Sequence, residues 1–220
     1  MTKIKAINER NMTAICRELA ASDERLAFVH RTYGTPPLWA RPKGFATLLN
    51  IILEQQVSLA SAKACFDKLD DHLGDVTPDR FLTVNDADLK TIGFSRQKTN
   101  YVRCLANAIV TGSLDVDALA TMPDPQVRSE LVALKGIGPW SAEIYLLMAL
   151  RRADAWPAGD LALQVAAQTI KGLPARPDPA ALNEIAESWR PWRAVAARLL
   201  WHHYLSKPAA FINSQSTNSQ

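Results

Sequence analysis

One short segment constrains the fold of this chain more than any other. Residues 134–142 read LKGIGPWSA, and apolar side chains recur at helical spacing both before and after them. Gly136 and Gly138 permit backbone angles closed to other residues, and Pro139 suits the first turn of a helix. We therefore expect a helix, a tight turn and a second helix, whose free backbone amides can bind an anion such as a phosphate. The alternative is a plain helical hairpin without a ligand.

Composition narrows the class of protein only moderately. The 220 residues suffice for one core or two small lobes, and 48% of them are hydrophobic without any long apolar run. No stretch is typical of a signal peptide or a membrane span, so we expect a soluble protein of the cytoplasm. The net charge of +3 permits binding to nucleic acid without requiring it. Cys16, Cys65 and Cys104 lack metal-ligand spacing, which predicts reduced thiols.

Helical periodicity runs through most of the chain. Apolar residues recur at helical spacing within residues 12–33, 45–69, 161–170 and 192–204. This pattern predicts an all-α fold of roughly ten short helices. Residues 1–11 are largely polar and are expected to be frayed, and residues 208–220 are expected to form a disordered tail.

A second hairpin is predicted at residues 89–95, LKTIGFS, which echo the first segment without its first glycine. Ser95 can cap the helix that follows. Arg96, Lys98 and Arg103 lie on or near that helix and could contact phosphates. A solvated basic face is the equally open alternative for each of them.

Several segments together resemble the helix-hairpin-helix (HhH-GPD) DNA glycosylase superfamily, which also contains endonuclease III. Besides residues 134–142, these are DAWPAGDLAL at 154–163, WRPWRA at 189–194 and LWHHY at 200–204. The last two resemble the alkylation-repair branch, the AlkA-type 3-methyladenine DNA glycosylases II. The resemblance implies one glycosylase domain over residues 12–207, made of two helical lobes with a cleft between them. The middle lobe would span about residues 45–150, and the other lobe residues 12–44 and 151–207.

Asp160 matches the catalytic aspartate of this family. It directly precedes an apolar helix, so a plain N-cap is the simplest alternative role. The two roles are compatible, because a helix N-terminus favours an ionised carboxylate. Such an anion can stabilise the positive charge that builds on the sugar as a base departs, and can orient or deprotonate the attacking water.

Trp140 stands where relatives that also cut the DNA backbone carry a Schiff-base lysine. Tryptophan has no amine, and Lys135 lies on the other side of the glycines. The resemblance therefore implies a monofunctional enzyme that uses water and leaves an abasic site.

Trp140 and Trp201 are the predicted walls of the base pocket, since a cationic alkylated purine stacks well on tryptophan. For five further aromatic residues, packing against other side chains is the main interpretation. Trp189 and Trp192 are predicted to lie in the core, whereas Trp39, Phe45 and Trp156 could pack or contribute to the pocket. Asp154 suits a loop cap or a salt bridge. His202 and His203 are adjacent on a helix and point apart, which argues against a metal pair.

Gln55 and Gln56 interrupt the apolar stripe of residues 45–69. In the resembled family a side chain from this helix end fills the gap left by the flipped nucleotide, and the pattern places Gln56 there with Gln55 beside it. An amide in that place could hydrogen-bond the orphaned partner base. The alternative is an amide pair bonded to the backbone.

The resemblance also assigns roles to the hairpin backbone. It implies phosphate binding at Gly136, Ile137, Gly138 and Ser141. A Na+ or K+ ion would be held by the backbone carbonyls of Val132, Leu134 and Ile137. The chain has no cysteine after Cys104, so the iron–sulfur cluster of several relatives is not expected.

The predicted function is that of a monofunctional DNA glycosylase of base excision repair. It would flip alkylated bases such as 3-methyladenine and 7-methylguanine out of duplex DNA and hydrolyse their N-glycosidic bond. We expect a nucleoid-associated monomer without a required cofactor. Deaminated or oxidised bases are an alternative substrate class. A non-catalytic helix-hairpin-helix DNA-binding protein is a further alternative, which would need the hairpin amides but not Asp160.

Overall fold

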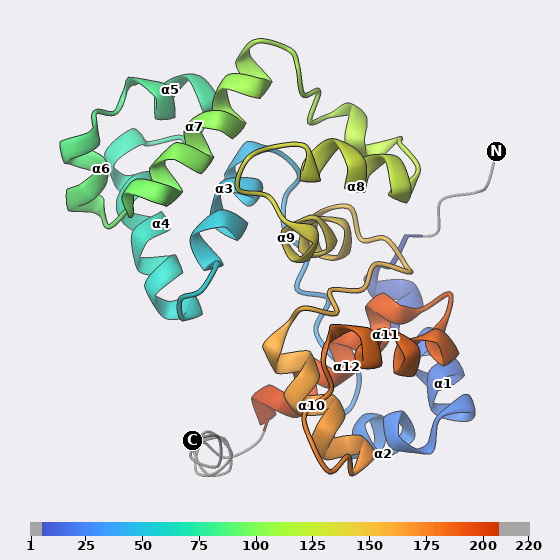
Figure 1. Ribbon diagram of the computed structural model, residues 1–220. Helices are drawn as coiled ribbons and strands as arrows, with labels where there is room; N and C mark the ends of the chain where they lie inside the picture. Colours follow the sequence, from blue (N-terminus) through green and yellow to red (C-terminus); the bar gives the residue numbers. More distant parts are fainter. Residues whose placement is uncertain (1–5, 207–220) are drawn as a thin grey trace. The chain divides into compact units, whose positions relative to one another are not determined.

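A computed structural model describes residues 6–206, which are almost entirely helical (Figure 1). Within this range there are twelve α-helices and no β-sheet, and one isolated antiparallel bridge joins Ala6 and Arg152. The predicted all-α fold is confirmed. No helix between residues 6 and 206 is both long and apolar enough to cross a membrane.

The described chain divides into two compact units, close to the predicted lobes. Unit 1 is the continuous segment Ala40–Leu150, and unit 2 combines residues 6–39 with residues 151–206. Residues 1–5 and 207–220, which include part of the predicted frayed start and the predicted tail, lie outside the described residues.

Unit 1 contains seven of the helices and is built around α3. Its elements are α3 (Phe45–Glu54), α4 (Leu59–Leu73), α5 (Pro78–Thr83), α6 (Asp86–Ile92), α7 (Arg96–Val110), η1 (Ala118–Ala120), α8 (Asp124–Val132), α9 (Pro139–Ile144) and the π-helical η2 (Tyr145–Ala149). Residues 48, 49 and 51–53 of α3 are all buried, which is typical of a helix enclosed on most sides. Accordingly, α3 contacts α4, α7, α9 and η2.

Polar caps determine where these helices begin and end. The Ser58 hydroxyl accepts a hydrogen bond from the Ser61 amide at the start of α4, and Ser95 caps α7 in the same way. Gly74 ends α4 in the left-handed conformation at φ 69°. The predicted second hairpin between α6 and α7 and the predicted cap at Ser95 are confirmed.

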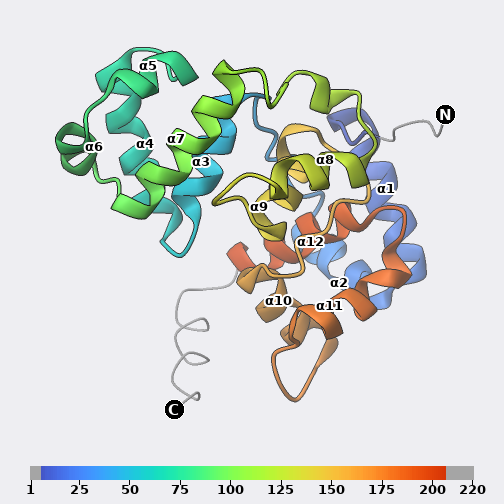
Figure 2. The same ribbon diagram turned by 45° about the horizontal axis from the view of Figure 1, so that its top comes forward.

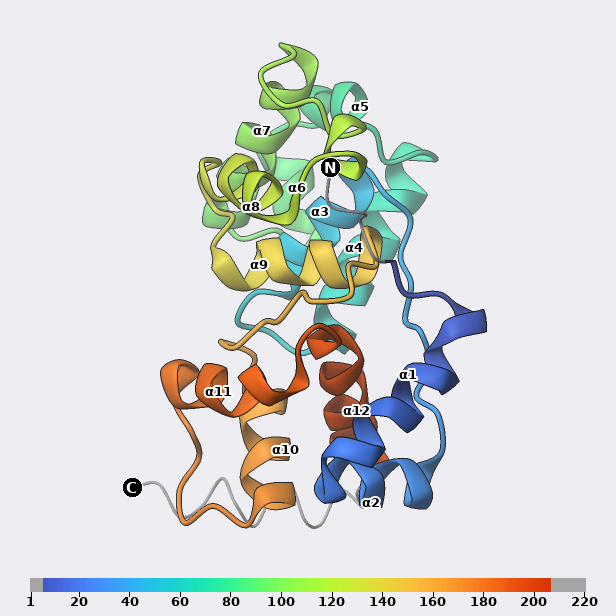
Figure 3. The same ribbon diagram turned by 90° about the vertical axis from the view of Figure 1, so that its right-hand side faces the viewer.

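Unit 2 is built around its last helix. Its elements are α1 (Glu9–Ser22), α2 (Glu24–Tyr33), α10 (Leu161–Lys171), α11 (Pro179–Ala186), η3 (Glu187–Trp189) and α12 (Arg193–Ser206). Helix α12 contacts α1, α2 and α10 (Figure 3). Ten of its residues are buried, including the charged Arg193 and Arg198, so this helix is enclosed on most sides by the rest of the protein.

The prediction of a frayed segment at residues 1–11 is wrong for residues 6–11. Helix α1 begins at Glu9, and Asn8 and Asn11 form a capping box in which each side chain accepts a hydrogen bond from the other residue's amide. Ile7 is fully buried, and its amide donates to the Arg151 carbonyl at 2.8 Å. A reciprocal cap and one anchored apolar residue therefore order a segment that is polar on average.

Asp23 joins three elements of unit 2. Its Oδ1 caps α2, and its Oδ2 accepts hydrogen bonds from Lys171 Nζ at 2.6 Å and from Trp189 Nε1 at 2.8 Å. Burial alone would raise the pKa of this carboxyl, but these hydrogen bonds outweigh it and lower the pKa below its usual value. Trp189 is fully buried, which confirms its predicted place in the core.

Candidate active site and nucleic-acid interface

Asp160 is the N-cap of α10 in unit 2. Its Oδ1 accepts one hydrogen bond from the Leu163 amide and a second from the indole N–H of Trp201, both at 3.0 Å. The side chain is half-buried at the end of a turn in which the Asp160 amide donates to the Pro157 carbonyl. The carboxylate that caps α10 is thus also the predicted catalytic carboxylate. It is held by the Leu163 amide and by Trp201, which lies 41 residues further along the chain.

Trp201 comes from the buried helix α12 and is only 8% exposed. The structure therefore brings together two of the predicted site residues, Asp160 and Trp201, in direct contact. Trp39 also contacts Trp201, with ring centroids 6.2 Å apart and an interplanar angle of 76°. This edge-to-face geometry is favourable for aromatic pairs.

The other aromatic residues of unit 2 are mainly structural. Trp156 is buried and packs against Trp189. Trp192 is half-buried and donates to Glu18 Oε1 at 2.7 Å, so its predicted core position is wrong. Its indole N–H is satisfied by a surface carboxylate instead.

Polar side chains near the site also have structural roles. Asp154 forms ion pairs with Arg190 and Arg193, which confirms its predicted salt bridge. His202 and His203 both have rings beside Tyr33. Between residues 6 and 206 no cluster of side chains is suited to a metal ion.

The hairpin of unit 1 joins α8 to α9 as predicted (Figure 2). Gly136 has φ 95°, and a Cβ atom there would lie 2.1 Å from Cγ of Tyr101, so only glycine fits. Gly138 has an ordinary φ of −95° and open space around it, so of the two glycines only Gly136 uses a backbone angle closed to other residues. The buried Ile137 side chain anchors the turn between them.

Gln55 is attached to this hairpin. Its Nε2 donates to the Gly136 carbonyl at 2.8 Å and to Ser141 Oγ at 2.9 Å. Ser141 is only 2% exposed, and its hydroxyl accepts the hydrogen bond from Gln55 inside unit 1. Phosphate binding at Ser141 stays a prediction. The bond to Gly136 matches the alternative for Gln55, an amide bonded to backbone. Its gap-filling role stays a prediction.

Gln56 lies in the turn between α3 and α4. It is exposed and has φ 57°, one of three positive φ values among the non-glycine residues 6–206. Residues in this region of backbone space are uncommon and strained, and they concentrate at functional sites. The structure thus separates the two adjacent glutamines, with Gln55 holding the hairpin and Gln56 facing solvent.

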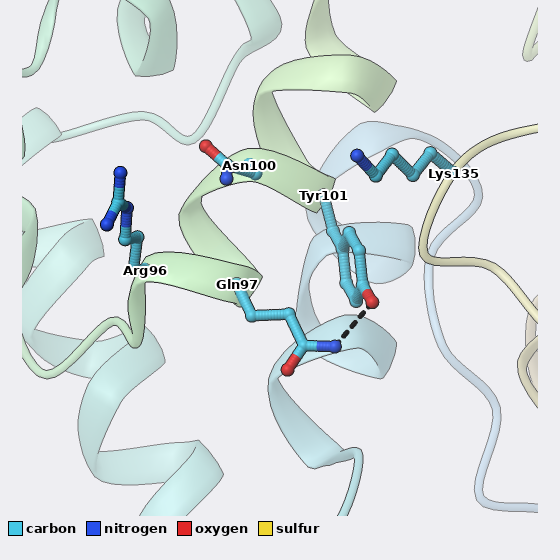
Figure 4. A pocket seen from close by; sticks show the side chains of 5 residues that line it. All are labelled: Arg96, Gln97, Asn100, Tyr101 and Lys135. Atoms are coloured by element: carbon cyan, nitrogen blue, oxygen red, sulfur yellow. Dashed lines mark hydrogen bonds between the residues drawn. The ribbon is translucent and has the colours of Figure 1, made fainter.

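A shallow pocket of about 360 Å³ lies between α7 and the residue before Gly136 (Figure 4). It is lined by Arg96, Gln97, Asn100, Tyr101 and Lys135. The first four come from α7, and Lys135 faces them from the hairpin (Figure 4). The lining contains two cations, two amides and a phenol but no carboxylate, a composition that suits an anion.

Two of the three basic residues highlighted in the sequence have structural roles. Lys98 Nζ donates to the Leu53 carbonyl at 2.6 Å, which caps the C-terminal end of α3, and burial lowers the pKa of this lysine. Arg103 donates to the Val84 carbonyl and pairs with Asp86. Arg96 alone of the three lines the pocket.

Trp140 is half-buried in the first turn of α9, in unit 1. Asp160 and Trp201 belong to unit 2, so the shared base pocket of Trp140 and Trp201 stays a prediction. Sequence reasoning missed the pocket contribution of Lys135 and the contact between Trp39 and Trp201. The position of Lys135 beside the glycines could have indicated its place in the pocket. Nothing in the sequence pattern indicated the contact between Trp39 and Trp201.

These features define a family of DNA repair proteins. Residues 49–191 match the family described as HhH-GPD superfamily base excision DNA repair protein, and the chain belongs to this superfamily. The resemblance inferred from the hairpin and the Asp160 segment is thereby confirmed.

Individual relatives point to one branch. The DNA-3-methyladenine glycosylase of Bacillus subtilis is 26% identical over 196 residues, covering 84% of this chain and 65% of that protein. DNA-3-methyladenine glycosylase 2 of Escherichia coli is 26% identical over 160 residues, covering 70% of this chain and 53% of that protein. This chain therefore spans between about half and two thirds of the length of these two relatives.

Two solved structures share the fold over most of the chain. The DNA-3-methyladenine glycosidase of Bacillus halodurans has a TM-score of 0.75 and 28% identity, covering 93% of this chain and 94% of that one. The 3-methyladenine DNA glycosylase of Schizosaccharomyces pombe, solved with abasic DNA, has a TM-score of 0.80 and 23% identity, covering 86% of this chain and 95% of that one.

Proposed function

We propose that this protein is a monofunctional DNA glycosylase that hydrolyses the N-glycosidic bond of alkylated bases in duplex DNA. The observation that carries the proposal is the hydrogen bond between Trp201 Nε1 and Asp160 Oδ1 at the N-terminus of α10. It fixes a carboxylate beside an electron-rich ring, the pair that removal of a cationic base requires. The names of the relatives and of the solved structures favour 3-methyladenine as a substrate.

The reaction follows from the chemistry of this carboxylate. As the bond between the sugar and the alkylated base breaks, the base leaves with the bonding electrons and becomes neutral, while positive charge develops on the sugar. The Asp160 carboxylate stabilises that charge, and the nearby helix N-terminus favours the anion. Water then adds to the sugar carbon and loses a proton to Asp160 or to solvent. The product is an abasic site.

Base selection rests on charge. A 3-methyladenine or 7-methylguanine in DNA carries a positive charge, which an indole face attracts more strongly than a neutral base. The same charge makes the base a good leaving group, so no dedicated general acid is needed. In this proposal the ring of Trp201 stacks on the cationic base. Trp140 carries no amine, so no Schiff base forms and the DNA backbone stays uncut.

DNA is bound by unit 1 in this proposal. The backbone amides at Gly136 and Gly138 receive one phosphate, whereas the Ile137 amide donates to the Leu134 carbonyl at 3.1 Å. The pocket of Arg96 and Lys135 receives another, since its cations have no acidic partner within 4.0 Å among residues 6–206. Gln56 fills the gap that base flipping leaves in the duplex.

A monovalent cation at the hairpin is part of the proposal but takes no part in the reaction. Val132 is the last residue of α8, where carbonyls lack intrahelical partners, and the Leu134 carbonyl lies in the turn that follows. Together with the carbonyl of Ile137 they offer the oxygen ligands that a Na+ or K+ ion accepts. We further propose that the enzyme acts as a monomer in the cytoplasm, on the nucleoid, without a required cofactor.

Base release from randomly methylated duplex DNA tests the proposed function. The purified protein is incubated with this DNA, and the free bases are separated by chromatography. We expect 3-methyladenine, with or without 7-methylguanine, to be released, and borohydride to trap no covalent adduct. Tight DNA binding without release of any methylated base would contradict the proposal. DNA carrying deaminated or oxidised bases would then identify the alternative substrate class.

A further inference from the structure

Trp39 has a backbone conformation that large side chains rarely adopt. Its φ is 45°, in the left-handed region, at the end of the loop that follows α2. Such a conformation persists only where the surrounding structure enforces it, and it is concentrated at functional sites. Trp39 is also half-buried rather than enclosed, so burial in the core does not account for the strain.

A buried arginine holds this backbone. Arg198 on α12 is fully buried; its Nε donates to the Leu38 carbonyl and its Nη1 to the Ala194 carbonyl, both at 2.8 Å. Burial lowers the pKa of Arg198 to about 10, so the guanidinium remains charged at neutral pH. Burying a charged group is expensive unless it makes such bonds. Here one of them fixes the residue directly before Trp39.

The ring of Trp39 stands against the proposed site. Its edge-to-face contacts are with Trp201, at 6.2 Å, and with His202, at 6.4 Å. Trp201 in turn donates to Asp160. A series of contacts thus runs from Arg198 through Leu38 and Trp39 to the ring that holds the carboxylate, all within unit 2.

The neighbouring histidine adds no competing charge. Burial lowers the pKa of His202 below its usual value, so this ring is neutral at physiological pH. Trp39, Trp201 and His202 therefore form an uncharged aromatic group with one half-exposed tryptophan.

We infer that Trp39 is a positioning residue for base excision, which fixes the ring of Trp201 against Asp160 and adds a second electron-rich ring for the cationic base. This inference rests on the proposed glycosylase function. This role differs from packing alone, because it requires an aromatic ring at residue 39 and not only a side chain of similar volume.

The test compares Trp39→Leu with Trp39→Phe in the full chain. Leucine fills much of the volume without a π system, whereas phenylalanine keeps a ring. We expect the single-turnover rate of 3-methyladenine release to fall about tenfold in Trp39→Leu and to stay within about threefold of the native rate in Trp39→Phe. The affinity for the methylated duplex, measured by fluorescence anisotropy, should change less than about threefold in both variants.

Trp192→Leu is the matched control. Trp192 is a half-buried tryptophan of the same unit, bonded to Glu18 rather than to the site, and its replacement should leave the excision rate unchanged. Equal losses in Trp39→Leu and Trp39→Phe, or a native rate in Trp39→Leu, would overturn the inference while leaving the glycosylase function intact. If the native protein releases no methylated base, the proposed function fails and this inference fails with it.

Discussion

The two units of this protein use different kinds of chemical group. Unit 1 offers a backbone turn at Gly136 and a pocket lined by the cations Arg96 and Lys135, groups that recognise phosphate without reading sequence. Unit 2 offers a carboxylate held by a buried ring, Asp160 with Trp201. In the proposed function, DNA affinity and the bond-breaking step depend on residues from different compact units. The comparison therefore leads us to expect that each can be altered separately.

The largest effect on unit 1 is expected from Gly136→Ala. The new methyl group would collide with Tyr101, and alanine is disfavoured at φ 95°. We expect affinity for duplex DNA to fall about 100-fold, equivalent to about 2.7 kcal/mol. The measurement is an anisotropy titration with circular dichroism as the folding check.

Gly138→Ala is the matched control for that substitution. Its φ is −95°, and a Cβ atom added there would meet no other atom within 4 Å, so the loss of affinity should be much smaller. Equal losses in the two variants would mean that the backbone geometry of Gly136 is not what makes the hairpin bind.

A smaller effect, confined to the chemical step, is expected from Trp201→Phe. Phenylalanine keeps an aromatic ring but loses the N–H that donates to Asp160. Loss of one hydrogen bond to a charged group predicts a single-turnover rate about 30-fold lower, with DNA affinity nearly unchanged. A comparable loss of affinity would break the proposed separation between the units.

The smallest effect is expected from Arg96→Ala combined with Lys135→Ala. Removing two phosphate contacts should reduce the slope of log affinity against log salt concentration by about 2. Excision at saturating enzyme should hardly change. Arg31→Ala with Arg176→Ala removes two exposed charges from unit 2 and serves as the control. If both double variants alter the slope equally, the pocket has no special role.

Local sequence signals predicted much of this architecture. The turn at Gly136, the cap at Ser95 and the cap at Asp160 all depend on residues within a few positions of one another. Such local preferences can be read from a single sequence. The ordered residues 6–11 were missed because average polarity conceals a reciprocal cap.

Contacts between distant residues could not be predicted in the same way. Gln55 reaches Ser141 across 86 positions of sequence, and its amide has no local signature that distinguishes this role from that of Gln56. The contact between Trp39 and Trp201 likewise depends on how a loop and a buried helix pack. Residue type suggested each of these positions. Only the tertiary structure distinguishes Gln55, which supports the hairpin, from the exposed Gln56.

The most direct test of the central claim is the single-turnover rate of 3-methyladenine release by Asp160→Asn. Asparagine can still cap α10 and accept the Trp201 N–H, so fold and contacts are retained while the negative charge is lost. We predict a rate at least about 1000-fold lower, with affinity for the methylated duplex within about threefold of the native value. Excision at the native rate would contradict the assignment of Asp160 as the catalytic carboxylate.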